Sequence, residues 1–239
     1  MSTIEKYALV TGAADRIGKA VALRLAKMGY NIIIHYNRSK EKALQTKKEI
    51  EALGKKAKLV QLDFSNTDTY YTIFEKLYQE GFSIEILVNS ASDFKPSSIF
   101  DEGNKSLRHF FTINFESAYL LTKVFAKYYI KGQIINFLDT KVEKNETEHL
   151  DYLLSKKLLK EFTYLSAMQL GPDIRVNAIA PGLILPPPGK DKNYLNSLRK
   201  NNPLQTIGSL EQIQNTMQFL VENPFLSGQI IYVDGGENL

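Results

Sequence analysis

The sequence has no cysteine and only three histidines, and each shortage excludes a kind of chemistry. Without cysteine there are no disulfides and no thiolate nucleophile, which fits a reducing compartment. The histidines, His35, His109 and His149, lie far apart in the sequence with no metal-ligand spacing. We therefore expect no metal site.

Long apolar runs and basic runs are also missing. The first apolar run, residues 7–10, is far too short to span a membrane, and nothing resembles a signal peptide. The formal charge of +4 comes with no basic run of the length or aromatic interleaving typical of a nucleic-acid-binding patch. We expect a soluble, cytoplasmic protein that binds neither membranes nor nucleic acid.

What is present is a regular alternation of short apolar runs and amphipathic stretches. Hydrophobic residues make up 44% of the 239 residues, enough for the core of one α/β domain over residues 1–239. The apolar runs are read as strands that are apolar along their whole length, and the amphipathic stretches between them as helices. This pattern predicts a doubly wound parallel sheet, the Rossmann fold, with helices on both faces. The predicted strands cover residues 7–10, 31–36, 59–62, 84–88, 133–137, 175–179 and 230–233.

Helical spacing of apolar residues predicts a helix over residues 17–28, with Gly29 at its C-terminal end. Ser39 is the expected N-cap of a charged helix that ends near Gly54. Ligands of doubly wound sheets bind at the carboxyl ends of the strands. The residues that follow each predicted strand are therefore the candidates for function.

The first such segment, residues 11–18, reads T-G-A-A-D-R-I-G and leads straight into a helix. Small residues let the backbone approach a pyrophosphate, and the helix N-terminus offers free N–H groups and a positive dipole. The alternative is an ordinary tight turn between a strand and a helix. The candidate cofactor contacts in this turn are Gly12, Asp15, Arg16, Ile17 and Gly18.

The second predicted strand ends without the acid that usually binds the ribose 2′-hydroxyl of NAD. In its place stand His35, Tyr36, Asn37, Arg38 and Ser39. Arg38, Ser39 and Arg16 can bind a 2′-phosphate through charge-assisted hydrogen bonds, so we predict NADPH as cofactor. The alternative is a solvated arginine beside a helix cap.

The third predicted strand is followed by Asp63 and Phe64. Asp63 is placed to bond the adenine amino group of the cofactor. As an alternative, it is a surface aspartate that caps a helix.

Tyr152 and Lys156 lie at i and i+4, so a helix presents both side chains on one side. An unperturbed phenol is a poor acid at neutral pH, and a nearby ammonium favours the phenolate. We expect Lys156 to lower the pKa of Tyr152 and to hold the nicotinamide ribose. Asp139, thirteen residues before Tyr152, suits a substrate with ring nitrogens, to which a proton must be passed; the alternative is a polar loop residue.

With these residues in hand, the chain resembles the short-chain dehydrogenase/reductase family from about residue 6 onward. The T-G-x-x-x-G-x-G turn of that family has Arg16 at its middle glycine, and Asp139 stands where the family commonly has a serine. Within the family the chain looks most like the pteridine reductases and dihydromonapterin reductases, on Arg16, residues 35–39, residues 91–94 (A-S-D-F) and Asp139.

The resemblance implies further roles. Ser92 would bond both the cofactor and the pterin, and Phe94 would stack on the pterin ring; the alternative is that Phe94 is a core aromatic. Asn114 would support Lys156 through water, and a homotetramer is the family expectation. The remaining cofactor contacts it implies are Asn89, Ser90, Ala91, Pro181, Gly182 and Ile184, beside Tyr152 and Lys156.

Two segments depart from the family pattern: N-S-A at residues 89–91 in place of N-N-A, and the loop over residues 183–188. The function we predict is NADPH-dependent reduction of a dihydropteridine to its tetrahydro form, with dihydrofolate as a further candidate substrate. Tyr152, Asp139 or an ordered water supplies the proton. Two rivals stand beside it: a carbonyl reductase for 3-ketoacyl thioesters, and a non-catalytic NADPH-binding regulator.

Overall fold

The computed structural model describes residues 5–66, 69–187 and 189–239, so Pro188 of the loop noted above lies outside it. Its centre is one seven-stranded parallel sheet in the order β3-β2-β1-β4-β5-β6-β7. The strands are β1 Lys6–Val10, β2 Asn31–Tyr36, β3 Ala57–Gln61, β4 Ser83–Asn89, β5 Gly132–Phe137, β6 Ile174–Pro181 and β7 Ile230–Val233. The prediction of a doubly wound sheet is confirmed.

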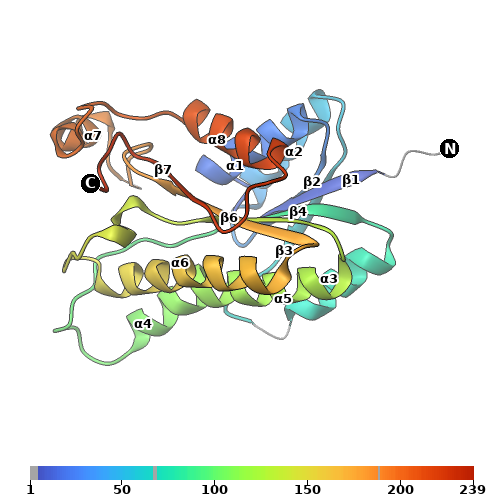
Figure 1. The fold of residues 1–239 in the computed structure, drawn as a ribbon, viewed down its shortest axis with the longest axis horizontal. Helices are drawn as coiled ribbons and strands as arrows, with labels where there is room; N and C mark the ends of the chain where they lie inside the picture. The colour runs from blue at the N-terminus through green and yellow to red at the C-terminus, as the bar shows by residue number, and fades with distance from the viewer. Residues whose placement is uncertain (1–4, 67–68, 188) are drawn as a thin grey trace.

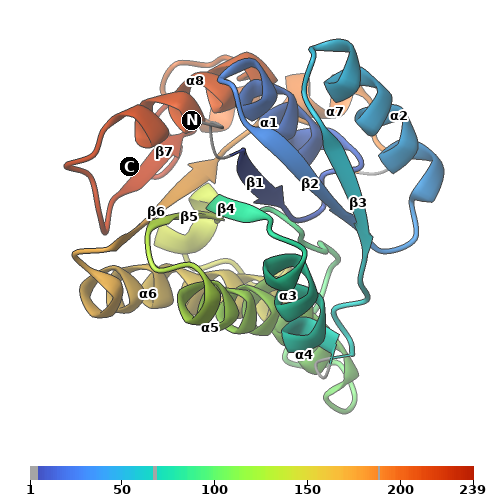
Figure 2. The same cartoon turned by 90° about the vertical axis from the view of Figure 1, so that its right-hand side faces the viewer.

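Helices cover both faces of the sheet, as Figure 1 and the turned view in Figure 2 show. One layer holds α1 Arg16–Lys27, α2 Lys40–Ala52 and α8 Leu210–Glu222, and the other holds α3 Thr69–Gln79, α5 Ser117–Tyr128 and α6 Leu150–Leu170. Shorter elements are α4 Lys105–Phe110, a π-helix over Phe111–Glu116, α7 Lys192–Leu198 and the 3-10 turns Thr140–Glu143 and Arg199–Asn201.

The hydrophobic core is divided by the sheet into two main clusters. Val21, Leu25 and Met217 pack with one face, and Phe74 and Phe125 pack with the other. Because both faces are covered, the central strands are apolar throughout, which is the pattern that predicted them. Among the described residues no helix is both long and apolar enough to cross a bilayer.

Most predicted boundaries agree with the structure. The strands β2 and β7 have the predicted bounds, and Gly29 and Gly54 lie just beyond the ends of α1 and α2 with φ of 107° and 75°. The prediction for β3 was shifted, because this edge strand is only partly buried and includes the polar Gln61 at its end. Ser39 is the N-cap residue of α2, as predicted, although its side chain makes no capping hydrogen bond.

The strand order changes direction between β1 and β4. From this point the chain connections run outward on both sides, so the loops after β1 and β4 separate and leave a crevice at the carboxyl edge of the sheet. Ligand-binding residues are therefore expected in the segments that follow β1, β2, β4, β5 and β6.

Candidate active site

A cleft of about 780 Å³ lies at the carboxyl ends of these strands. Most of the candidate residues named from the sequence line it. They are Gly12, Asp15, Arg16, Ile17, Gly18, His35, Tyr36, Asn37, Arg38, Ser39, Asp63, Phe64, Ser90, Ala91, Ser92, Phe94, Asp139, Tyr152, Lys156, Pro181, Gly182 and Ile184. Asn89 and Asn114 are not among the described residues that line it.

The glycine turn between β1 and α1 is packed so tightly that side chains would not fit. A Cβ on Gly12 would come within 3.0 Å of the Cα of Ala91, and one on Gly18 within 2.3 Å of the carbonyl oxygen of Gly12. The Thr11 hydroxyl accepts the N–H groups of Ser90 and Ala91, which ties the turn to the end of β4. Glycine at these two positions lets the turn pack closely against the end of β4 and the start of α1, and the helix N-terminus that follows suits a phosphate group.

Arg16 has a φ of 54°, a left-handed conformation that costs a non-glycine residue roughly 1–2 kcal/mol. This explains why the family pattern has glycine here. The side chain Nη2 donates to the Pro186 carbonyl at 2.8 Å, so the guanidinium reaches from the turn to the loop after β6. The chain accepts backbone strain at a position that brings a positive charge to the cleft.

The His35 side chain supports the glycine turn through a hydrogen bond. Its Nδ1 accepts the Gly12 N–H at 3.1 Å, which leaves Nε2 as the protonated nitrogen, 3.0 Å from the Leu62 carbonyl. The ring also stacks on Phe64, with centroids 4.4 Å apart. Both nitrogens are therefore engaged within the protein, and His35 serves as a link between the turn and the segment that carries Asp63.

Burial lowers the pKa of His35 from 6.5 to about 4. The neutral ring therefore contributes stability that is complete above pH 6.5 and is lost as the pH falls toward 4. Between pH 7 and pH 5 this group should lower the free energy of unfolding by about 2 kcal/mol. Urea unfolding at the two pH values checks this, with His35→Asn as the comparison. Equal pH dependence in the two proteins would contradict it.

The segments after β2 and β3 meet at one end of the cleft. Arg38 is exposed there. Hydrogen bonds from Ser65 lower the pKa of Asp63, and the charge of the Arg38 guanidinium lowers it further. The Asp63 carboxylate accepts the N–H and the hydroxyl of Ser65, so it closes a local turn while lining the cleft. Positive charge and hydrogen-bonding groups are thus gathered beside the expected adenosine position.

The other end of the cleft holds Tyr152, Lys156 and Asp139. The Tyr152 hydroxyl donates to Asp139 Oδ2 at 2.7 Å, while the Lys156 Nζ donates to the Phe137 carbonyl at 2.8 Å. Helix α6 places both side chains on one side, as predicted. Asp139 Oδ1 accepts the Lys141 N–H, which fixes the carboxylate at the start of a 3-10 turn.

The expected effect of Lys156 on Tyr152 is contradicted. Burial raises the pKa of Tyr152 well above its usual range, and the adjacent Asp139 carboxylate raises it further. Burial lowers the pKa of Lys156 to about 8, against the opposing charge of Asp139. The phenol therefore faces a carboxylate rather than the ammonium and keeps its proton at neutral pH.

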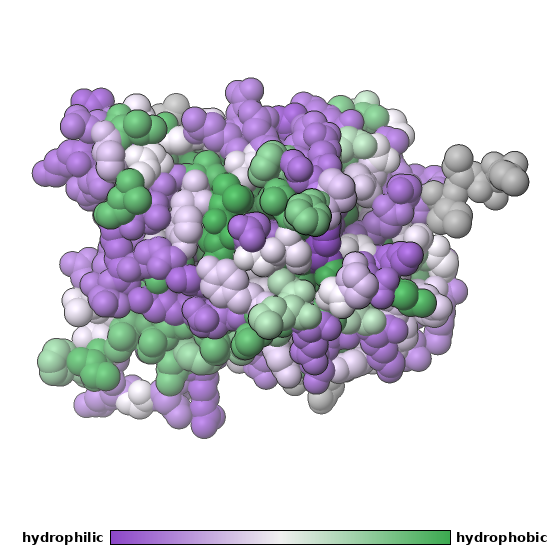
Figure 3. Space-filling model, viewed as in Figure 1, coloured by the Kyte–Doolittle hydropathy of each residue, from purple (hydrophilic) through white to green (hydrophobic). Residues whose placement is uncertain are grey.

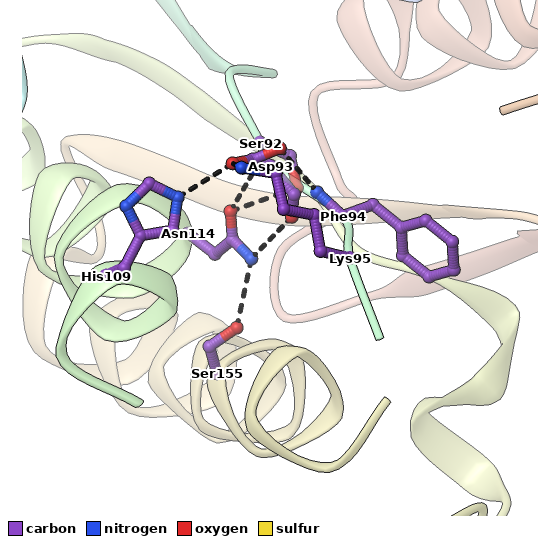
Figure 4. A network of polar contacts seen from close by, with 7 residues as sticks. All are labelled: Ser92, Asp93, Phe94, Lys95, His109, Asn114 and Ser155. Carbon is purple, nitrogen blue, oxygen red and sulfur yellow. Dashed lines mark hydrogen bonds and ion pairs between the residues drawn. The ribbon is translucent and has the colours of Figure 1, made fainter. Parts of the chain in front are cut away.

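Asn114 occupies the π-helix and is fully hydrogen-bonded through its side chain. Its oxygen accepts from the Ser92 hydroxyl and the Asp93 N–H, and its nitrogen donates to the Asp93 carbonyl and the Ser155 hydroxyl. The donors and acceptors of the amide are thus used within the protein, and the support of Lys156 through water stays a prediction. The Asn114 side chain ties the loop after β4 to α6 (Figure 4).

Asp93 completes this network. Its carboxylate accepts the Phe94 N–H at 2.9 Å and lies 2.7 Å from His109 Nε2 and 3.2 Å from the Lys95 ammonium. Figure 4 shows the Phe94 ring projecting away from the polar cluster. The loop after β4 is therefore held by polar contacts on one side, and its aromatic ring is left for the cleft.

The Phe94 ring stands between the rings of His149 and Tyr152. It stacks on His149 with centroids 4.3 Å apart and meets Tyr152 edge-on at 4.7 Å. It is half-buried and lies outside the buried core clusters, so it is not a core aromatic. An apolar ring thus stands next to the Tyr152–Asp139 pair.

Asn89 serves the sheet rather than the cleft. Its amide nitrogen donates to Asn136 on the neighbouring strand β5 at 2.9 Å, and the side chain is buried. Only through the following residues, Ser90 and Ala91, does this segment reach the cleft.

Several residues of the cleft escaped the sequence reasoning. His109, Lys141, Tyr194 and Glu237 all line it. Lys141 and Tyr194 lie in short elements between the main strands and helices, whose course no periodic pattern predicts. Glu237 follows the last predicted strand, 230–233, by four residues, so the rule that ligands bind beyond the strand ends was a usable signal for it. The described residues contain no group of three acids or histidines arranged for a metal ion.

Comparison with known proteins agrees with this geometry. Residues 12–238 match a family model described as enoyl-(acyl carrier protein) reductase. Alternative dihydrofolate reductase 1 (FolM) of Brucella suis, crystallised with NADP, is 31% identical, with a TM-score of 0.91 over 100% of this chain and 96% of that one.

Two curated relatives are similar over almost their full length. The 3-oxoacyl-[acyl-carrier-protein] reductase of a Synechocystis species is 30% identical over 97% of this chain and 96% of its own. The dihydromonapterin reductase of Klebsiella pneumoniae is 27% identical over the same shares of the two chains. With the nucleotide turn, the Tyr152–Lys156 pair and the sheet order, these matches place the chain in the short-chain dehydrogenase/reductase family of oxidoreductases.

Proposed function

We propose that this protein reduces dihydropteridines to their tetrahydro forms with NADPH. The observation that carries the proposal is the contact between the Tyr152 hydroxyl and the Asp139 carboxylate, beside the half-buried ring of Phe94. A flat ring gains from stacking on an aromatic side chain. A ring nitrogen needs a proton rather than a polarised carbonyl, and an acid pair of this kind can deliver one.

The cofactor assignment rests on the fit of the chain to a dinucleotide. The turn around Gly12 has no room for a Cβ, and Arg38 stands at the end of β2 where an acid would repel a 2′-phosphate. The Brucella suis structure, of the same fold, was crystallised with NADP. The cofactor of this chain is NADPH, and when bound it supplies a hydride.

The chain's own residues would handle the proton. Tyr152 and Asp139 share one proton across a 2.7 Å contact, and passing it to the substrate nitrogen leaves two neighbouring negative groups. The Lys156 ammonium lies 6.0 Å from the centre of the Tyr152 ring and offsets that charge. The pair then regains a proton from solvent. Lys156 therefore helps the transfer by stabilising the deprotonated pair.

A substrate panel tests the proposal. We expect oxidation of NADPH, followed by its absorbance, with 7,8-dihydrobiopterin or dihydromonapterin and none with simple ketones. The 3-ketoacyl thioester reductase remains the second candidate, because the Synechocystis relative carries that name at 30% identity. Turnover of ketoacyl thioesters alone would establish it. Binding of NADPH without turnover of any substrate would establish a regulator.

Phe94 gives a sharper test of the pterin assignment. Phe94→Ala should weaken pterin binding by roughly 1–3 kcal/mol, the range for bases stacked on aromatic side chains. The affinity for NADPH should change little, because the Phe94 ring contacts His149 and Tyr152 at the opposite end from Arg38. Titration of each ligand by fluorescence checks both. A fall in melting temperature with equal loss of both ligands would instead assign Phe94 a structural role.

We also propose assembly into a homotetramer, the arrangement that the family resemblance implies. Large hydrophobic side chains are exposed along α5 and α6, and Figure 3 shows hydrophobic surface over this helical layer. These side chains are Tyr119, Leu154, Leu158, Leu165 and Met168. Exposed apolar patches of this kind mark protein–protein interfaces.

A further inference from the structure

Glu237 is a buried acid whose carboxyl group accepts no hydrogen bond from the described protein. Its side chain lines the cleft, the residue is only 8% exposed, and Oε2 has no hydrogen-bond partner among the described residues. Burying an unpaired carboxyl group is costly, and few such groups occur in native proteins. A buried acid aimed into a ligand cleft is stabilised when a ligand supplies the missing hydrogen bonds.

The turn that carries Glu237 is built to hold it in place. Asp234 accepts the N–H groups of Gly236 and Asn238, both at 2.9 Å. Gly235 and Gly236 have φ of 68° and 85°, which residues with a side chain rarely adopt. Glu237 is therefore presented by a closed, hydrogen-bonded turn rather than by a loose chain end.

The same turn is joined to the catalytic end of the cleft. The Thr140 hydroxyl, in the residue after Asp139, donates to the Asp234 carboxylate. A Cβ on Gly182 would lie 3.1 Å from Glu237 Oε2, so the carboxyl group lies directly over the start of the loop after β6. Glu237 thus belongs to the end of the cleft that holds Asp139 and Tyr152, away from Arg38.

The charges around Glu237 do not form an ion pair with it. Burial raises the pKa of this carboxyl group, and Asp139 and Asp234 raise it further. Lys144 and Lys141 act in the opposite direction, but the Lys141 ammonium is bonded to Glu146 at 2.7 Å. The two lysines offset part of this rise, while no donor of the described chain occupies the carboxyl oxygens.

We propose that Glu237 is a specificity-determining residue that accepts hydrogen bonds from N–H groups of the substrate ring. The inference rests on the proposed function. The edge of a pterin that carries the 2-amino group presents adjacent N–H donors, and two such donors match the two oxygens of a carboxylate. Glu237 would therefore select amino-substituted rings over rings with an oxygen in that position.

The test compares two substrates and three proteins. The substrates are a 7,8-dihydropterin and the matching dihydrolumazine, in which an oxygen replaces the 2-amino group. The proteins are the unaltered chain, Glu237→Gln, which keeps the shape of the side chain, and Glu211→Gln, an exposed acid of α8 outside the cleft lining. KM, kcat, the Kd of NADPH and the melting temperature are measured for each.

We expect Glu237→Gln to raise the KM for the dihydropterin roughly tenfold or more, the scale of a lost hydrogen bond to a charged group. The KM for the dihydrolumazine, the Kd of NADPH and the melting temperature should stay close to those of the unaltered chain. Glu211→Gln should change none of these.

Three results would overturn the inference. They are an unchanged KM in Glu237→Gln, an equal rise for both substrates, and a rise in the Kd of NADPH in the same ratio. Glu237→Asp is a second variant for the same test. It keeps the carboxylate but moves it back by one methylene, so the preference for the dihydropterin over the dihydrolumazine should be partly retained. Failure of the unaltered chain to reduce any dihydropterin would count against the proposed function. This outcome is separate from the comparison of the variants, which tests the role of Glu237.

Discussion

Replacing Tyr152 with phenylalanine should reduce turnover by at least roughly a hundredfold while leaving the Kd of NADPH almost unchanged. The substitution removes one oxygen and keeps the ring that meets Phe94 edge-on. It also removes the proton shared with Asp139, so the substrate nitrogen loses its donor. Steady-state kinetics with a dihydropterin and a fluorescence titration of NADPH measure the two quantities.

The Lys156→Ala variant supplies the contrast. Lys156 is expected to serve both the ribose and the Tyr152–Asp139 pair, so this change should impair cofactor binding and turnover together. Near-normal turnover in Tyr152→Phe would show that the proton comes from elsewhere, with Asp139 or an ordered water as the remaining sources.

Replacing Arg38 with aspartate should abolish or reverse the preference for NADPH over NADH. The unaltered protein should prefer NADPH by well over tenfold, because a charge-assisted contact with the 2′-phosphate contributes on the order of 1.5–3 kcal/mol. An aspartate at this position repels the phosphate and can accept the ribose hydroxyl. The ratio of kcat/KM for the two cofactors is the measurement.

Lys48→Asp is the matched control for this change. It alters the net charge by the same amount on an exposed position of α2, outside the cleft lining. Its cofactor ratio should equal that of the unaltered chain. Equal use of NADPH and NADH by the unaltered protein would refute the role of Arg38.

The sequence predicted the sheet well because each central strand is buried on both faces and therefore apolar along its length. β3 was placed less accurately because an edge strand carries polar residues such as Gln61. Tyr152 and Lys156 could be paired from helical spacing alone. The cleft lining was predicted by a simple rule, since strand ends of a doubly wound sheet face the ligand.

What the sequence did not predict is set by side-chain contacts between distant segments. The pKa of Tyr152 depends on whether Asp139 or Lys156 lies nearer its hydroxyl, and no spacing in the sequence decides this. The four hydrogen bonds of the Asn114 side chain, which join the loop after β4 to α6, could not be inferred from the sequence either. Glu237 was passed over because its significance depends on burial and on a missing partner, which only the folded chain reveals.

The strand order has a consequence for folding during synthesis on the ribosome. β1 is made first, yet one of its two neighbours is β4, with Lys6 opposite Ser83 and Val10 opposite Val88. Until that later strand emerges, the unit formed by β1, β2 and β3 exposes a row of unpaired backbone groups along β1, at the centre of the future sheet. Such an open edge can pair with a foreign strand. The nascent chain is therefore most vulnerable to aggregation before β4 is synthesised.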